Sequence, residues 1–226
     1  NTTASNNVGI GLNAAGGTTT GASNIAIGTN SLLQNTTGAL NVAVGSYALN
    51  ANTTAANNTA VGHSALTANT TGSENVAIGA QAGDAITTGA NNISIGYMAL
   101  GAETTGGRSV AIGRNALLVQ NFTGDELPYN VGVGYGAGAA VTTGINNTLI
   151  GGLAGDALTD ADFNVALGSL ALSSDTLGSR SVALGYGTLT AQNFTSATDA
   201  YNTAVGTLAG LSVTTGVRNT LIGGLA

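Results

Sequence analysis

The side chains of this chain that could do acid–base or nucleophilic chemistry are few. The chain has 226 residues, a single histidine, His63, no cysteine, and carboxylates scattered along its length. A catalytic triad needs a nucleophile, a base and a group that orients the base, and no such set can be assembled around His63. We therefore expect no catalytic residue and no enzyme activity, and we expect His63 to line the surface.

Two groups of acidic residues could hold a hard cation such as Ca²⁺, because carboxylate oxygens are its preferred ligands. These are Asp125–Glu126 and the pair Asp160 and Asp162. Neither lies in an EF-hand loop, and the Gly-Gly-x-Gly-x-Asp nonapeptide of calcium-binding β-rolls is absent. The glycine-rich stretch 132–136 resembles a phosphate loop, but no helix is expected to follow it. The sequence predicts neither a metal site nor a cofactor.

Aromatic and acidic residues gather in two segments that we call the first insertion (Gln120–Tyr129) and the second insertion (Gln192–Tyr201). Insertions of this kind form loops on one face of a repeat protein, often the binding face. Their side chains could stack on and hydrogen-bond a sugar or contact a host receptor. The alternative is that Phe and Tyr fold back as a clip over the adjacent coil. The candidate surface contacts are Phe122, Asp125, Glu126, Tyr129, Phe194, Asp199 and Tyr201.

The two insertions interrupt a short repeat of the form Asn-x-Ala-Val-Gly, which returns thirteen times. Ten of the twelve intervals are 17 residues, and the two that hold an insertion are 21. A fixed short period predicts a solenoid, in which each unit buries its apolar face by stacking on its neighbours. The coils begin at residues 7, 24, 41, 58, 75, 92, 109, 130, 147, 164, 181, 202 and 219.

A longer repeat of 72 residues starts at residue 58 and contains four coils, the last of which carries an insertion. Within it Gly83-Asp84-Ala85 returns as Gly155-Asp156-Ala157, and Arg108 returns as Arg180. The chain also starts and ends within a repeat phrase. We therefore expect residues 1–226 to be one repetitive segment of a longer fibre.

Numbered from the Asn, the coil has features of a β-strand followed by turns. Positions two and four are Val, Ile, Leu or Thr, which suit a strand, and position five is always Gly, which indicates positive φ or close backbone approach. Glycine and β-branched residues recur too often for helices. We predict an all-β, parallel β-solenoid of 17-residue coils. In it, Asn at position one forms an amide ladder and the Thr-Thr pair at positions thirteen and fourteen a hydroxyl ladder.

Position three lies between the two β-branched positions and therefore faces the opposite side of the strand. It is Ala, Gly, Ser or Leu and never charged, as at Ala26, Gly132, Ser94 and Leu149. We predict that it faces outward, against other copies of the chain around an axis. The alternative is an ordinary alanine-rich surface.

The composition excludes several classes of partner. Charged residues make up 6% of the chain, the net charge is −6, and the four basic residues are all arginines. This leaves no basic footprint for nucleic acid or for an anionic membrane surface. No run of 18 apolar residues exists, so we expect no membrane insertion in this segment.

Sequons of the form Asn-x-Ser/Thr occur repeatedly and would accept glycans in a eukaryotic secretory pathway. The alternative is that they only reflect ladders in a chain rich in Asn and Thr. The candidate acceptors are Asn1, Asn35, Asn52, Asn69, Asn121 and Asn193.

The phrases Asn41–Leu49 (NVAVGSYAL) and Ser109–Leu117 (SVAIGRNAL) resemble two related repeat families. One is the head of trimeric autotransporter adhesins, and the other is the Asn-Thr-Ala-Val-Gly-Tyr-x-Ala-Leu repeat of phage tail fibres and bacterial fibre-like surface proteins. The resemblance covers essentially the whole chain. It implies a homotrimeric, left-handed parallel β-roll that carries or forms an adhesive fibre. Adhesin head units are shorter, so these coils have an enlarged Asn-Thr-Thr-Gly turn.

The sequence therefore predicts a structural segment of an extracellular adhesive fibre that associates with itself and presents surfaces to a host, a substrate or a neighbouring cell. Its location would be the cell surface or a virion surface, and its partners surface glycans or a host receptor. The main alternative is the shaft or receptor-binding segment of a virion tail fibre. An ice-binding solenoid with Thr arrays and a hexapeptide-type acyltransferase with a catalytic His are weaker alternatives.

Overall fold

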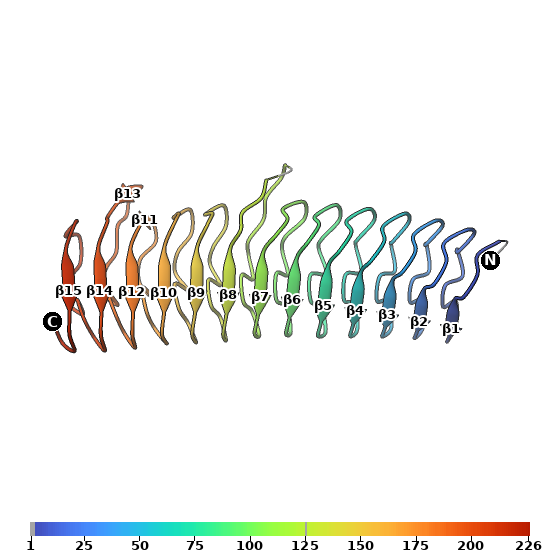
Figure 1. The fold of residues 1–226 in the computed structure, drawn as a ribbon, viewed down its shortest axis with the longest axis horizontal. Coiled ribbons are helices and arrows are strands. Elements are labelled where there is room, and N and C mark those ends of the chain that lie inside the picture. Colours follow the sequence, from blue (N-terminus) through green and yellow to red (C-terminus); the bar gives the residue numbers. More distant parts are fainter. Residues whose placement is uncertain (1–2, 125) are drawn as a thin grey trace. The chain divides into compact units, whose positions relative to one another are not determined.

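The structure, a computed structural model, describes residues 3–124 and 126–226, and this part of the chain contains strands and turns without a helix. Thirteen three-residue strands in the described residues are parallel and form a β-solenoid of about 17-residue coils, with one strand per coil (Figure 1). The all-β solenoid predicted from the sequence is confirmed. Within these residues there is accordingly no helix long and apolar enough to cross a membrane.

The strands of the solenoid sheet are β1 (Val8–Ile10), β2 (Ile25–Ile27), β3 (Val42–Val44), β4 (Thr59–Val61), β5 (Val76–Ile78), β6 (Ile93–Ile95), β7 (Val110–Ile112), β8 (Val131–Val133), β9 (Thr148–Ile150), β10 (Val165–Leu167), β12 (Val182–Leu184), β14 (Thr203–Val205) and β15 (Thr220–Ile222). Two further strands, β11 (Gly178–Ser179) and β13 (Thr198–Asp199), pair in a small parallel sheet.

The chain forms two compact units, one of Asn1–Arg108 with Asn121–Glu126 and one of Ser109–Gln120 with Leu127–Ala226. In the first unit the strands from β1 to β5 each pair with the strand 17 positions further along, so that Val42 lies beside Thr59. In the second unit, the pair β12 and β14 is separated by an insertion, and Val182 lies beside Thr203. Position two thus still pairs with position two. The insertion leaves the register of the sheet unchanged.

The invariant glycine at position five satisfies both conditions that the sequence indicated. At Gly28, φ is 131°, and an added Cβ would lie 2.6 Å from the carbonyl carbon of Gly45 in the next coil. The same arrangement recurs at Gly45 and Gly62, with φ of 135° and 137°. Side chains at this corner would therefore be strained and would also separate the coils.

Three other positions of the coil, seven, nine and seventeen, adopt left-handed backbone although most of them are not glycine. Examples are Leu40, Tyr47 and Leu49, with φ of 59°, 62° and 48°. Each such residue costs about 1–2 kcal/mol relative to right-handed backbone. Each of these N–H groups donates to a carbonyl of a neighbouring coil at 3.0 Å. Contacts between coils thus hold the corners in place.

The predicted orientation of position three is wrong. Ala26, Ala43 and Ala60 are fully buried, while the neighbouring positions two and four are half-buried or exposed. The small residues face the interior because the coil is thin there. A Cβ added to Gly132 would lie 2.9 Å from Leu117 Cγ and 3.0 Å from a backbone oxygen, that of Ala137. The β-branched residues are left on the outer face.

Side-chain sizes at positions three and nine compensate each other in this thin interior. Most coils combine a small residue at position three with Leu at position nine, as in Ala166 and Leu172, both fully buried. Leu149 reverses the order, because glycines stand at position nine of its own coil and of the coil before. A Cβ on Gly138 or Gly155 would lie 2.7 or 2.8 Å from a methyl group of Leu149.

The predicted amide ladder at position one is confirmed, and it lies inside the solenoid. Asn58 is fully buried. Its Oδ1 accepts a hydrogen bond from the backbone N–H of Asn75 at 2.9 Å, and its Nδ2 donates to the carbonyl of Gly72 at 3.0 Å. Its own N–H donates to Asn41 Oδ1 at 3.0 Å. Each Asn thus bonds within its own coil and to the coils before and after it.

The threonine ladder forms through backbone carbonyls. The Oγ1 of Thr36 donates to the carbonyl of Thr53 at 3.0 Å, and the Oγ1 of Thr53 donates to that of Thr70 at 3.1 Å. These hydroxyls therefore serve the stacking of coils.

Candidate functional site

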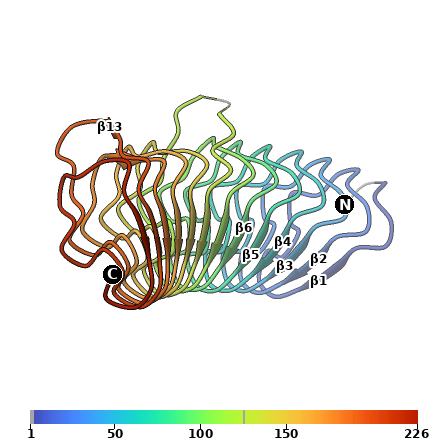
Figure 2. The ribbon, with the colours of Figure 1, turned by 60° about the vertical axis from the view of Figure 1, so that its left-hand side comes forward.

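The second insertion, which the sequence analysis had treated as a loop, contributes one strand to a small parallel sheet. Strands β11 and β13 pair, and the N–H groups of Thr198 and Ala200 donate to Leu177 and Ser179 at 3.2 and 3.0 Å. Figure 2 shows β13 standing out beyond the outline of the coils next to it. The tip of the insertion is thus a fixed part of the second unit.

A buried acid, Asp175, anchors the base of this insertion. It belongs to the preceding coil, at position twelve, and it is fully buried. Its Oδ1 accepts hydrogen bonds from the N–H groups of Gly178 and Phe194 at 3.1 and 3.0 Å. Its Oδ2 accepts one from Gln192 Nε2 at 2.6 Å. The carboxyl group thus satisfies buried donors at the point where the chain leaves the regular coil.

Glu103 has the corresponding role for the first insertion, in the first unit. It is also fully buried, and its Oε1 accepts hydrogen bonds from Gly106 N at 2.8 Å and Phe122 N at 3.2 Å. The hydroxyl of Thr105 donates to the carbonyls of Phe122 and Gly124, both at 2.7 Å. An acid one coil before the insertion is thus a shared structural device.

Both phenylalanines among the candidate surface contacts point inward. Phe122 and Phe194 are 6% exposed, and a Cβ added to Gly178 would lie 2.7 Å from the ring of Phe194. They therefore cannot offer a ring face to a ligand in this conformation. Their burial instead fits rings that fold back onto the adjacent coil, which is the alternative that the sequence analysis gave for these residues.

The acidic and tyrosine residues of the insertions lie on the surface. Tyr129 and Tyr201 are 45% and 48% exposed, and Glu126 and Asp199 are exposed as well. Glu126 Oε2 accepts a hydrogen bond from Gly124 N at 2.9 Å. Asp125 lies outside the described residues.

The structure brings Asp199 and Tyr201 together with two residues from other coils, Phe163 and Arg180. The Nε of Arg180 donates to Asp199 Oδ1 at 2.9 Å. Its guanidinium carbon lies 4.7 Å from the ring centre of Phe163 and 5.8 Å from that of Tyr201. We call Phe163, Arg180, Asp199 and Tyr201 the arginine cluster.

The sequence analysis missed Phe163 and Arg180 as site residues. A signal was present, because the last position of the coil reads Phe163, Arg180, Tyr201 and Arg218 in four successive coils. Each of these residues has left-handed backbone, which places it at the same corner of its coil. A row of alternating aromatic and basic residues at one corner could have been found by aligning the coils.

The candidate glycan acceptors divide by burial. Asn35, Asn52 and Asn69 are fully buried, and their Nδ2 groups donate hydrogen bonds to carbonyls of Gly38, Ala55 and Gly72. A glycan on these amides is incompatible with the folded chain. Asn121 and Asn193 are exposed, and their Oδ1 atoms accept hydrogen bonds from threonine hydroxyls. Asn1 lies outside the described residues.

His63, Asp160 and Asp162, which were considered for catalysis or cation binding, each contact a neighbouring coil. His63 is exposed, and its ring lies edge-on to Tyr47 with 6.2 Å between centroids. Asp160 accepts a hydrogen bond from Thr143 Oγ1 at 2.6 Å and Asp162 one from Ile145 N at 2.8 Å. In residues 3–124 and 126–226 no three acidic or histidine side chains gather as metal ligands would.

Two aspartates of the 72-residue repeat have a perturbed acidity. Desolvation raises the pKa of Asp84 above 3.8, and hydrogen bonds from the backbone N–H groups of Asp84 and Ala85 offset part of this effect. Desolvation likewise raises the pKa of Asp156, against one backbone hydrogen bond. Both shifts thus reflect partial burial beside the chain's own backbone.

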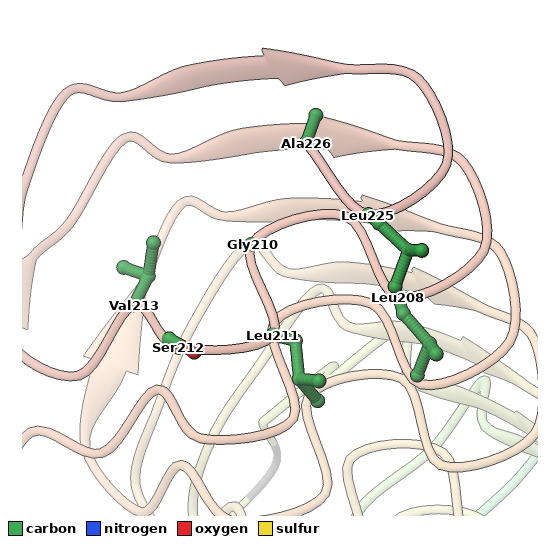
Figure 3. Close-up of a pocket in the computed structure, with 7 residues that line it drawn as sticks. All are labelled: Leu208, Gly210, Leu211, Ser212, Val213, Leu225 and Ala226. Atoms are coloured by element: carbon green, nitrogen blue, oxygen red, sulfur yellow. The ribbon is translucent and has the colours of Figure 1, made fainter.

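A cavity of about 510 Å³ opens at the last coil of the second unit, as Figure 3 shows. Its lining includes Gly210 and Val213, at positions nine and twelve. The residues at these positions one coil earlier, Leu189 and Gln192, are fully buried. The cavity is therefore the interior of the coil seen from its end. Its lining is Leu208, Gly210, Leu211, Ser212, Val213, Leu225 and Ala226.

Comparison with protein-family models, with curated proteins and with solved structures finds no match to this chain. The resemblance to adhesin-head and tail-fibre repeats therefore stays a prediction.

Proposed function

We propose that this chain is a structural segment of an extracellular adhesive fibre, in which copies associate through the outer face of the solenoid sheet and present the insertions to a surface. The observation that carries the proposal is the chemistry of that face. Positions two and four of the thirteen coils hold only Val, Ile, Leu and Thr, without a charge.

The outer face of the sheet is apolar and remains in contact with solvent in the isolated chain. In the first unit Ile25 and Ile78 are 37% and 40% exposed, and in the second unit Leu167 is 48% exposed. Contiguous exposed apolar patches of more than a few hundred Å² are rare on monomeric soluble proteins and mark interaction surfaces. A second copy of the chain would supply a matching face with the same repeat distance.

Self-association by this face replaces the interface at position three that the sequence suggested. Position three is buried in the interior of the coil, whereas the side chains at positions two and four lie on the outer face, where a second copy can contact them. Oligomerisation through a long repetitive face is more typical of a stiff structural element than of an enzyme. It would also bring several copies of the insertions together, so that weak individual contacts add up to strong binding through avidity. The extracellular location belongs to this proposal.

The proposal predicts that the chain is an oligomer in solution. Light scattering should give three times the chain mass of 21.7 kDa for the trimer implied by the resemblance. Val44→Lys with Ile78→Lys places two charges on the outer face and should shift the mass to that of a monomer, because burying an unpaired charge is costly.

Thr54→Lys provides the control, since Thr54 is exposed on the threonine turn, outside the sheet. This variant should keep the oligomeric mass and the β-type circular dichroism spectrum. A folded wild-type chain with a mass of 21.7 kDa would refute association through this face. Genes beside the coding sequence distinguish the two kinds of fibre: an outer-membrane anchor domain indicates a cell-surface adhesin, and baseplate genes indicate a virion tail fibre.

A further inference from the structure

The arginine cluster is a fixed group on an otherwise weakly charged surface. Arg180 lies between the rings of Phe163 and Tyr201, and its Nε holds Asp199 at 2.9 Å. The side chains of Arg180 and Asp199 are 40% and 53% exposed. A cation between two rings and beside a carboxylate has lost much of its conformational freedom before any ligand arrives.

The backbone under the cluster is also fixed. The N–H of Phe163 donates to Ile145 and that of Arg180 to Asp162, at 3.0 and 2.9 Å. Asp199 belongs to β13, which pairs with β11, and Phe194 at the start of the same insertion is held by the buried carboxyl of Asp175. Sites on paired backbone position their side chains better than sites on open loops.

Part of the hydrogen-bonding capacity of the cluster points to a ligand. Arg180 uses its Nε for Asp199, and a guanidinium carries further donors on its Nη atoms. Asp199 Oδ2 has Tyr201 Oη at 3.5 Å, which is too long for a strong hydrogen bond. Among the contacts of the described residues, donors of Arg180 and an acceptor of Asp199 thus remain side by side at the surface.

This pairing matches the chemistry of two adjacent hydroxyl groups of a sugar. Each hydroxyl both donates and accepts a hydrogen bond, so one can accept from Arg180 Nη while its neighbour donates to Asp199 Oδ2. Phe163 and Tyr201 are both exposed and offer apolar contact beside them. The charges of Arg180 and Asp199 cancel, and the chain carries a net charge of −6, which disfavours an acidic ligand.

We propose that the arginine cluster binds a neutral saccharide through a pair of vicinal hydroxyls, with Arg180 as donor and Asp199 as acceptor. This assignment rests on the proposed adhesive role and names its ligand class. The sequence analysis had placed sugar contact on the aromatic and acidic side chains of the insertions, Asp199 among them. In the structure, Phe194 is buried and Arg180 lies over the face of Tyr201, so the polar pair carries the recognition.

The test uses the full chain on an array of neutral gluco-, manno- and galacto-oligosaccharides together with sialylated and uronate oligosaccharides. A duplicate array is treated with periodate, which cleaves vicinal diols, and then with borohydride. Binding to at least one neutral oligosaccharide, lost after periodate treatment, is the expected result. Arg180→Gln and Asp199→Leu should each weaken the same binding by about tenfold or more.

Arg114→Gln is the matched control, because Arg114 is an exposed arginine at position six and outside the cluster. It should bind like the wild-type chain. Absence of binding, binding to acidic glycans alone, or binding that survives periodate or Arg180→Gln would overturn the assignment. Light scattering on the same samples separates the two proposals: an oligomer without saccharide binding refutes the ligand class alone, and a monomer refutes the fibre.

Discussion

At position twelve of the coil, three coils of the first unit carry Asn, whereas the coil before each insertion carries an acid. Asn35 Nδ2 donates to the carbonyl of Gly38, three residues on, at 2.9 Å. Asp175 reverses this polarity and accepts from the N–H of Gly178, also three residues on. The acid can therefore receive the N–H of Phe194, which an amide nitrogen would repel. One side chain thus determines where the coil can be extended.

We expect Asp175→Asn to lower the free energy of unfolding by about 1–3 kcal/mol, because in either orientation the amide nitrogen would face at least one of the donors that now bond to the carboxyl group. Urea denaturation followed by circular dichroism measures this change. Ser174→Ala, at an exposed neighbour, should leave the midpoint unchanged. Equal stability of Asp175→Asn and the wild type would show that the carboxyl group does not anchor the insertion.

At the scale of the element, the side chains at position three of the strand and at position nine of the following turn fill the same interior space. Leu149 in β9 fills space that Gly138 and Gly155 leave open, whereas most coils with Ala at position three, such as that of Ala166 and Leu172, have Leu at position nine. Protein interiors are packed closely enough that such exchanges must be matched. The interior of the solenoid therefore constrains pairs of residues that are six positions apart within one coil.

Leu149→Ala should cost about 2–5 kcal/mol through the cavity it leaves, and Gly155→Leu alone should also destabilise, because its side chain would meet Leu149. The double variant restores the residue types of Ala166 and Leu172 at these two positions and removes the contact with Leu149, although that with Leu158 remains. A double-mutant cycle in urea should therefore give less destabilisation than the sum of the single variants. Strict additivity would contradict the shared volume.

At the scale of the whole molecule, the solenoid is a series of coils whose surface residues differ while their strands pair in the same register. Each unit is stabilised by contacts of every coil with its neighbours, as in other repeat proteins. Growth is tolerated at the turn after position twelve, where both natural insertions occur, since the register of the strands stays intact. The strand and the glycine corner tolerate no such change.

Deletion of residues 41–57, one whole coil of the first unit, should leave a folded β-solenoid, because Asn58 then takes the place of Asn41 beside Asn24. Insertion of one Gly after Val44 should be far more destabilising, since it displaces the corner at Gly45 and turns side chains to the opposite face. Thermal unfolding followed by circular dichroism compares the two variants. A higher melting temperature for the insertion variant would contradict this view of the coil.

The sequence by itself determined the architecture. A period of 17 residues with Gly at position five and Asn at position one allows each coil to repeat its neighbour. The structure has the β-solenoid, the amide ladder and the positive-φ glycine corner that this pattern predicts. The sequence could not determine which face of the strand points into the solenoid. Alternation separates positions two and four from position three without saying which side is enclosed. Only the thin interior, closed by Leu117 and its equivalents, places the small residues inside.

The candidate site likewise needed the tertiary structure. Asp199 and Tyr201 could be selected from the insertion alone, but Phe163 and Arg180 come from two earlier coils and meet them only when the coils stack. Phe194 could be selected as aromatic, yet its burial depends on the space over Gly178 and on Asp175. Period and composition are local properties of the chain, whereas burial and contact between coils depend on how neighbouring coils fill one another's space.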